Sequence, residues 1–468
     1  MRKPFRSALA ILVLLGAPSL AAAQQPVDWP ALEREAVGRL QEYLRLDTTN
    51  PPGHELEAAR WFQRVLAAEG IEARVLDTAE LQPAGRANLY ARLRGNGAKK
   101  AIALVNHMDV VPASASDWSA PPFSGELRDG YLYGRGALDM KGNGLVQLMA
   151  MIALKRSGVP LTRDIVFVGN ADEELGSTGA MLFAERHADL LRDVEFLLTE
   201  GGGNVVSGDT VQFIGVGVAE KRTFWHRLTV RGTAGHGSRP LPDNPVVRLV
   251  HALDKLARYE TPLHVSPGVA KYFRDLSTKY TGERRRWLAD VRAAVREPKG
   301  RAWILADPGW NAVLRNTISF TGLTGSNKTN VIPAEASAEL DIRLLPDTDP
   351  EAFLATLKRV VGDSSVHWTP LLEPKAPLES PIDTELFHAI ERAAADRFPR
   401  ATVTTPMLSG ATDRPAYRKL GIVTYGFDPF LVPRSESARG VHGVDERISV
   451  ANVGFGVRFL YDVLRYAQ

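Results

Sequence analysis

Histidine and carboxylate side chains recur in this sequence directly after short apolar runs. The first such place is residues 104–109, Leu-Val-Asn-His-Met-Asp, where His107 and Asp109 follow the apolar run 101–105. An imidazole with a carboxylate two residues further on is typical of a metal ligand and the group that orients it. A histidine at a strand end is also compatible with ordinary hydrogen bonding, so the remaining motifs must decide between the two interpretations.

Four further segments place imidazole or acidic groups in the same kind of position, at the end of a predicted strand or the start of a predicted helix. They contain Asp139, the pair Glu173 and Glu174, Glu200, and His442. Ligands at the carboxyl ends of parallel strands are where open α/β sheets keep their active sites. The chain has no cysteine, so any zinc site must use His, Asp and Glu.

The elements that must position these groups alternate between helical and strand patterns. Helices are expected at 29–46, 55–69, 141–156 and 383–397, and strands at 87–93, 101–106, 164–169, 195–199, 401–405 and 422–425. This alternation predicts an α/β fold with a doubly wound mixed sheet and helices on both faces.

The pattern changes near residue 220 and changes back near 347. Strands with one exposed face are expected at 223–231, 316–320 and 336–344, with a helix at 245–258. We therefore expect an inserted α+β lid domain at 221–346, between two parts of a catalytic domain at 24–220 and 347–468. A Trp- and Arg-containing helical stretch near 261–315 has no clear place in this scheme.

The first residues have the pattern of an export signal. A basic start, the apolar run 8–15 and the small residues 19–23 predict cleavage near Ala23, and the apolar run is too short for a stable membrane anchor. The segment 1–23 carries three of the 57 basic residues and none of the 54 acidic ones, so the rest of the chain is near neutral. We expect an exported protein, periplasmic or secreted, with no nucleic-acid partner.

These motifs, in this order, resemble the dizinc metallopeptidase and deacylase family of aminoacylase, acetylornithine deacetylase, succinyl-diaminopimelate desuccinylase and glutamate carboxypeptidase. The resemblance runs from about residue 40 to the C-terminus. It includes the segments 46–53, 235–238, 329–333, 341–343 and 409–413. It is greatest to the exported, long-lid, carboxypeptidase-like branch of that family.

The resemblance implies two divalent metal ions, zinc in the first place, with cobalt or manganese as substitutes. One ion takes His107 and Glu200, the other takes Glu174 and His442, and Asp139 bridges them, with a cis peptide after Asp139. These residue types are ones that divalent ions of this class accept.

The resemblance also implies the roles of the residues that act on the substrate. Glu173 is the general base for attack by a hydroxide that bridges the metals, and Asp109 holds the metal-ligating histidine. The lid residue His236 stabilises the oxyanion, either within its own chain or across a homodimer formed by the lid. Arg343 and Asn330 bind a substrate carboxylate, and Gly410 lines the pocket.

The expected reaction is cleavage of an amide or peptide bond that releases an amino acid with a free carboxylate. This is the chemistry of a carboxypeptidase or an N-acyl-amino acid deacylase, acting on a short peptide or an N-acyl-amino acid. The alternatives are a dipeptidase or aminopeptidase of the same fold, a non-catalytic binding protein, and a two-metal phosphoester or lactam hydrolase.

Overall fold

The computed structural model describes residues 26–468 apart from 79–84, 209, 373–377, 434–435 and 437–439. The expected export signal at 1–23 lies outside the described residues. None of the helices in the described ranges has the length and apolar character that crossing a bilayer requires.

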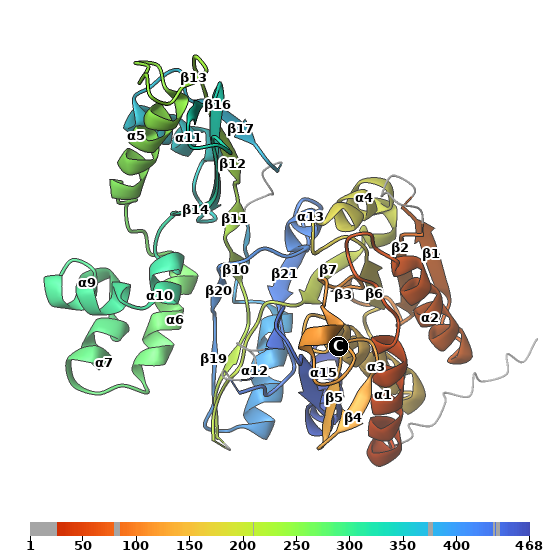
Figure 1. Cartoon of the computed structure of the whole chain (residues 1–468). Helices are drawn as coiled ribbons and strands as arrows, with labels where there is room; N and C mark the ends of the chain where they lie inside the picture. Colours follow the sequence, from red (N-terminus) through yellow and green to blue (C-terminus); the bar gives the residue numbers. More distant parts are fainter. Residues whose placement is uncertain (1–25, 79–84, 209, 373–377, 434–435, 437–439) are drawn as a thin grey trace, which may run out of the picture.

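A six-stranded mixed sheet forms the centre of the larger domain (Figure 1), in the order β1-β2-β6-β3-β7-β21. The strands are Ala73–Asp77 (β1), Ala87–Leu93 (β2), Ala101–His107 (β3), Ile165–Asn170 (β6), Val194–Thr199 (β7) and Val423–Gly426 (β21). The last four run parallel, whereas β1 and β2 pair antiparallel at one edge. β3 and β6 are buried over their full length, which explains their continuous apolar sequence.

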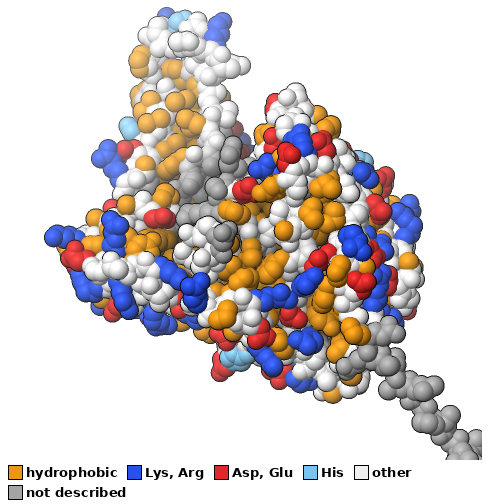
Figure 2. Space-filling model, turned by 90° about the horizontal axis from the view of Figure 1, so that it is seen from below, with side chains coloured by type: hydrophobic (Ala, Val, Ile, Leu, Met, Phe, Trp, Pro, Cys, Tyr) orange, Lys and Arg blue, Asp and Glu red, His pale blue; other side chains and the backbone are white. Residues whose placement is uncertain are grey.

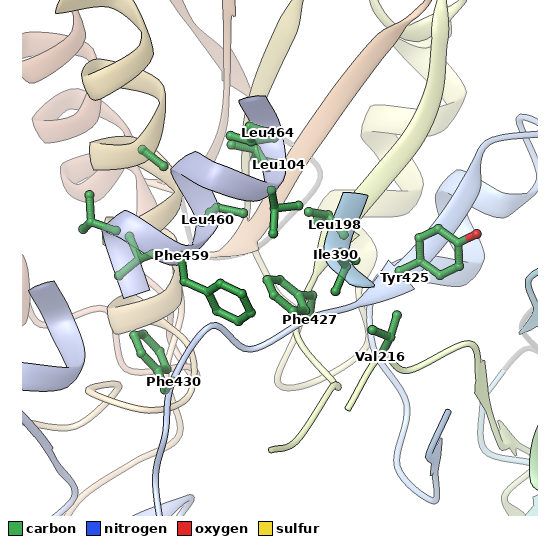
Figure 3. Packing of buried hydrophobic residues seen from close by; sticks show 14 of the residues in the cluster. Leu104, Leu198, Val216, Ile390, Tyr425, Phe427, Phe430, Phe459, Leu460 and Leu464 are labelled. Atoms are coloured by element: carbon green, nitrogen blue, oxygen red, sulfur yellow. The ribbon is translucent and has the colours of Figure 1, made fainter. Parts of the chain in front are cut away.

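Helices cover both faces of this sheet. On one face lie α1 (Trp29–Leu44), α2 (Glu55–Ala68), α3 (Lys141–Ser157), α12 (Glu385–Arg397) and α15 (Val450–Tyr466), and on the other α4 (Thr178–Arg186) and α13 (Arg414–Arg418). Successive strand side chains point to opposite faces, so Leu104 joins the first core and Val105 the second. Figure 3 shows Leu104 among residues of the first core, with Phe459 and Leu460 of α15. The prediction of a doubly wound α/β fold is confirmed.

Three small sheets and two short 3₁₀ helices surround this centre. The sheets have the orders β22-β5-β4, β19-β9-β8 and β18-β10-β20. Their strands are Glu126–Arg128 (β4), Tyr131–Tyr133 (β5), Val205–Ser207 (β8), Thr210–Gly215 (β9), Ala219–Glu220 (β10), Leu378–Glu379 (β18), Thr402–Thr404 (β19), Met407–Leu408 (β20) and Arg447–Ser449 (β22), and the 3₁₀ helices are Ala115–Asp117 and Ala188–Leu191. β10 and β20 lie where the chain leaves the catalytic domain for the lid (Figure 1).

The lid is a second sheet with its own core. Its strands are Arg222–Thr223 (β11), His226–Arg231 (β12), Thr317–Thr324 (β14), Glu335–Leu344 (β16) and His367–Pro370 (β17). Two further strands, Gly235–His236 (β13) and Val331–Ile332 (β15), pair with each other in a separate two-stranded sheet. The helices α5 (Pro245–Arg258) and α11 (Pro350–Val361) pack on one face of the sheet. Every second residue of β16 is buried, as a strand with one covered face requires.

The lid continues beyond the boundary at 346 that we expected from the sequence. Phe353 and Leu357 of α11 belong to the lid core, and β17 pairs antiparallel with β12. The unit therefore ends near Pro370, and the second part of the catalytic domain begins after it.

Residues 267–313 form a helical insertion between α5 and β14. Its helices are Pro267–Ser277 (α6), Gly282–Ala289 (α7), Val291–Ala294 (α8), Pro298–Leu305 (α9) and Pro308–Val313 (α10). Its buried residues, among them Phe273 and Leu288, belong to the core of the catalytic domain and not to that of the lid. The insertion is thus part of the lid in sequence and part of the catalytic domain in packing.

Candidate active site

Six of the acidic and imidazole residues singled out from the sequence lie around the carboxyl ends of the central strands. His107 is the last residue of β3, Glu173 and Glu174 follow β6, and Glu200 follows β7. Asp139 lies between β5 and α3, and His442 lies in the turn before β22. The carboxyl ends of parallel strands lie at the same end of the sheet, so the groups that follow these strands come close together.

The carboxylate of Asp139 lies between the two histidines. Its Oδ1 is 3.1 Å from Nε2 of His107, and its Oδ2 is 3.0 Å from Nε2 of His442. Glu200 Oε2 is 3.8 Å from Nε2 of His107, and Glu174 Oε2 is 3.2 Å from Nε2 of His442. The structure therefore brings all five expected ligands together, with one acid in the centre and a histidine and a glutamate on each side.

The donor set fits divalent metal ions. Ligand atoms of His107, Asp139 and Glu174 lie within 4.8 Å of one another, as do those of His107, Glu173 and Glu200. The second carboxylate oxygen of Glu174, Oε1, is buried without a hydrogen-bond partner. A buried, unpaired carboxylate oxygen is costly, and a cation removes that cost.

The charges of the cluster point the same way. Burial raises the pKa of Glu200 to about 8, and burial together with the nearby Glu200 carboxylate raises the pKa of Glu173 well above its usual range. Hydrogen bonds to Asp139 and Glu174 raise the pKa of His442 to about 10. Several carboxylates crowd into one partly buried site, and nearby opposite charge favours their being ionised together.

Asp109 fixes the positions of three neighbouring groups. Its carboxylate accepts hydrogen bonds from the backbone N–H of Glu173 and of Glu174, each at 3.1 Å, and from the Asn50 side chain at 2.8 Å. Nδ1 of His107 lies 3.0 Å from the main-chain oxygen of Asp109 and 3.6 Å from its carboxylate. Asp109 thus holds the glutamate pair as well as the histidine that we expected it to orient.

A buried network behind Asp109 was missed in the sequence. Asn50 also donates to Asp172, and Arg86 pairs with both Asp172 and Glu55. Asp172 has a φ of 66°, in the left-handed region that non-glycine residues rarely adopt. The network holds the turn that carries Glu173, and the only sequence signal for it was the turn-rich segment around Asn50.

Glu446 is a second residue that the sequence did not reveal. Its buried carboxylate accepts hydrogen bonds from the backbone N–H of Gly136 (2.9 Å), Leu138 (2.7 Å) and Asp139 (3.0 Å), and from Arg135 Nη1 (2.7 Å). Glu446 lies four residues after His442. One carboxylate therefore ties the segment of that histidine to the loop that presents the central acid, whose following peptide is cis, as the resemblance implied.

A cavity of about 930 Å³ opens beside the cluster. Asp139, Glu200, Asp428 and the loop with Gly410 are part of its lining. The carboxylate of Asp428 is partly buried and accepts the N–H of Gly202 at 3.0 Å, so it fixes the chain directly after Glu200.

The three expected lid residues do not line this cavity. His236 is exposed on β13, where its Nδ1 lies 2.8 Å from the Ser238 hydroxyl. Asn330 is exposed beside it and accepts a hydrogen bond from the N–H of Gly237 through its main-chain oxygen. Arg343 on β16 is bound to Asp341 at 2.7 Å. In this arrangement the lid sheet stands apart from the cluster (Figure 1).

The role of Glu446 can be tested by removing its charge. We expect Glu446→Gln to weaken Zn²⁺ binding about 10- to 100-fold, since one amide oxygen cannot accept the three backbone N–H bonds and its NH₂ group faces donors. A titration against a chelator of known affinity measures this. The control is Asp164→Asn. It changes a buried carboxylate that accepts hydrogen bonds from Arg92 and from the N–H of Gly95, at the amino end of β6 and away from the cluster. Equal loss in the two variants, or wild-type affinity in Glu446→Gln, would contradict the role.

Comparison with known proteins identifies the family of this chain. The family model "Peptidase family M20/M25/M40" matches residues 103–466. The N-fatty-acyl-amino acid synthase/hydrolase of Xenopus tropicalis is 30% identical over 370 residues, which cover 77% of this chain and 71% of that protein. Human aminoacylase-1 is 26% identical over 428 residues, 90% of this chain and 92% of that protein.

A solved structure shares the fold. The metallo-carboxypeptidase Sso-CP2 of Sulfolobus solfataricus, at 20% identity, superposes with a TM-score of 0.72 and covers 92% of this chain and 99% of its own. The match of the family model over most of the chain, including every residue of the cluster around Asp139, shows that this protein is a metal-dependent hydrolase of peptidase family M20/M25/M40.

Proposed function

We propose that this protein binds two zinc ions and hydrolyses an amide bond to release an amino acid with a free carboxylate. The observation that carries this proposal is the central position of Asp139, with one carboxylate oxygen toward each histidine. His107 and Glu200 would hold one ion, and His442 and Glu174 the other, with Asp139 shared. When bound, two such ions lower the pKa of water at the site and polarise the substrate carbonyl.

Glu173 is the residue that moves the proton. It is not needed as a ligand in this arrangement, yet a carboxylate oxygen of Glu173 lies within 4.8 Å of His107 and Glu200 ligand atoms. It takes a proton from the attacking water as the new C–O bond forms, and it delivers that proton to the nitrogen as the C–N bond breaks. The N–H of Glu173 is bound to Asp109, so the backbone of this base is fixed.

The adjacent glutamates allow a matched test of this division of roles. We expect Glu173→Gln to bind zinc with wild-type stoichiometry and to lose activity about 10²- to 10⁴-fold, because only the proton transfer is removed. Glu174→Gln is expected to lose metal as well as activity. Metal content by mass spectrometry and turnover of an N-acyl-amino acid are the two measurements. Near wild-type turnover in Glu173→Gln would remove that residue from the mechanism.

The substrate class is supported by the relatives, whose names include an N-fatty-acyl-amino acid hydrolase and an aminoacylase. The rival within the fold is a dipeptidase or aminopeptidase, and human carnosine dipeptidase 1 shares the fold with a TM-score of 0.67. A deacylase or carboxypeptidase accepts a blocked N-terminus, whereas an aminopeptidase requires a free one. Paired substrates with free and acetylated N-termini therefore distinguish the two activities.

The lid completes this site in our proposal. His236 donates a hydrogen bond to the oxyanion, and Arg343 and Asn330 bind the carboxylate of the substrate. Because none of the three lines the cavity here, we propose that the lid of a second copy supplies the histidine. The outer face of the lid has the exposed apolar residues Val250 (50%) and Leu323 (70%), around a hollow of about 470 Å³, which suits a self-complementary contact.

Mixing two inactive variants tests this arrangement. Co-expressed Glu173→Gln and His236→Ala chains form hybrid dimers in which one site has both an intact base and an intact histidine from the partner subunit. Half of randomly paired dimers are hybrids, so we expect roughly a quarter of wild-type activity. Light scattering gives the oligomeric mass. A monomeric mass, or a mixture as inactive as its components, would contradict the proposal.

We also propose that the protein is exported and that the leader is removed near Ala23. This rests on the basic start and the apolar run of the first residues. N-terminal sequencing of the protein from the periplasm or medium is expected to begin at Gln24. An intact N-terminus on protein that stays inside the cell would contradict export.

A further inference from the structure

The helical insertion supplies one wall of the cavity beside the metal-binding cluster. Tyr272 and Leu276 of α6 and Trp310 and Val313 of α10 line it, opposite groups of the catalytic domain such as Phe213 and Met407. More than half of all the lining residues have apolar side chains. Figure 2 shows hydrophobic side chains along the junction between the insertion and the catalytic domain.

This wall is fixed to the catalytic domain. Thr405 Oγ1 donates to the main-chain oxygen of Gly268 at 3.0 Å, and Lys271 Nζ donates to that of Val403 at 2.9 Å. The N–H of Gly268 also donates to Glu379. Because these partners lie in the strands and loops beside β9 and β20, the insertion keeps its place next to the cluster whatever position the lid sheet takes.

Aromatic packing stiffens the wall from behind. Trp310 packs edge-on against Phe273 and Trp303, each with ring centroids 5.4 Å apart. Trp303 in turn packs on Trp287 at 5.7 Å. A preformed apolar surface binds an apolar group without first having to order its own side chains.

We propose that the helical insertion is the specificity wall of the active site and selects substrates with a long or bulky apolar group beside the scissile amide. This inference rests on the proposed amide hydrolysis and adds to it the chemistry of the preferred substrate. The apolar group has two sources, the acyl chain or the side chain of the released amino acid. The volume of about 930 Å³ lies at the upper end for ligand pockets and holds more than a small acyl-amino acid.

Three substrates separate these sources: N-acetylglycine, N-dodecanoylglycine and N-acetylphenylalanine, each with the zinc-loaded full-length protein. We expect wild-type kcat/KM to be at least about tenfold higher for one of the two apolar substrates than for N-acetylglycine. The substrate that shows the preference identifies the apolar group that the wall contacts.

Two variants place this preference on the insertion. Leu276→Glu, at a half-buried helical position, and Trp310→Ala are each expected to lower the ratio of kcat/KM for the preferred apolar substrate to kcat/KM for N-acetylglycine about tenfold. Leu127→Glu is the matched control, since Leu127 is 50% exposed on β4 of the catalytic domain, and it should leave all three rates unchanged.

Two results would overturn the inference and leave the proposed function intact. They are a wild-type preference for N-acetylglycine, and a loss in the wall variants that is equal for all three substrates. A different result, no cleavage of any of the three by the zinc-loaded wild type, would overturn the proposed function itself.

Discussion

The structure depends on one electrostatic constraint, the crowding of carboxylates around two imidazoles at the carboxyl ends of the central strands. Asp139 contacts both histidines, and Glu174 and Glu200 approach from either side. Asp139, Glu174 and Glu200 are largely buried, so water screens their repulsion less than it would at the surface, and two imidazolium charges cannot balance these three carboxylates together with Glu173. Divalent cations held among these acids would let them all stay ionised, and such cations would also supply the activation of water that amide hydrolysis can use.

Buried carboxylates next to the cluster fix the backbone of the segments that carry its side chains. Asp109 binds the N–H groups of Glu173 and Glu174, and Glu446 binds those of the loop that ends in Asp139. Each of these buried acids is satisfied by main-chain donors, which cannot swing away as side chains do. The cluster is therefore preorganised by segments that lie far apart in the sequence.

Much of this could be predicted from the sequence, because the signals are local. The apolar run before His107 predicts a buried strand, and its polar end predicts the position of the site. Glu174 and Glu200 follow β6 and β7, the two strands that flank β3, so the convergence of these side chains followed from the fold class and the family resemblance together.

The parts that could not be predicted depend on contacts between distant segments. Nothing local to Glu446 indicates that its carboxylate binds a loop more than 300 residues earlier. The predicted end of the lid at residue 346 was wrong because the helical pattern of α11 and the strand pattern of β17 also suit the catalytic domain. Only the packing of α11 in the lid core and the pairing of β17 with β12 assign them to the lid. Likewise, the amphipathic helices of the insertion could have packed on either core, and the sequence does not say which.

The most direct test of the central claim is anomalous diffraction at the zinc edge from crystals of the zinc-loaded protein. The account predicts two peaks about 3.5–4 Å apart, one beside His107 and Glu200 and the other beside Glu174 and His442, with Asp139 in contact with both. A single peak, or peaks away from Asp139, would contradict it.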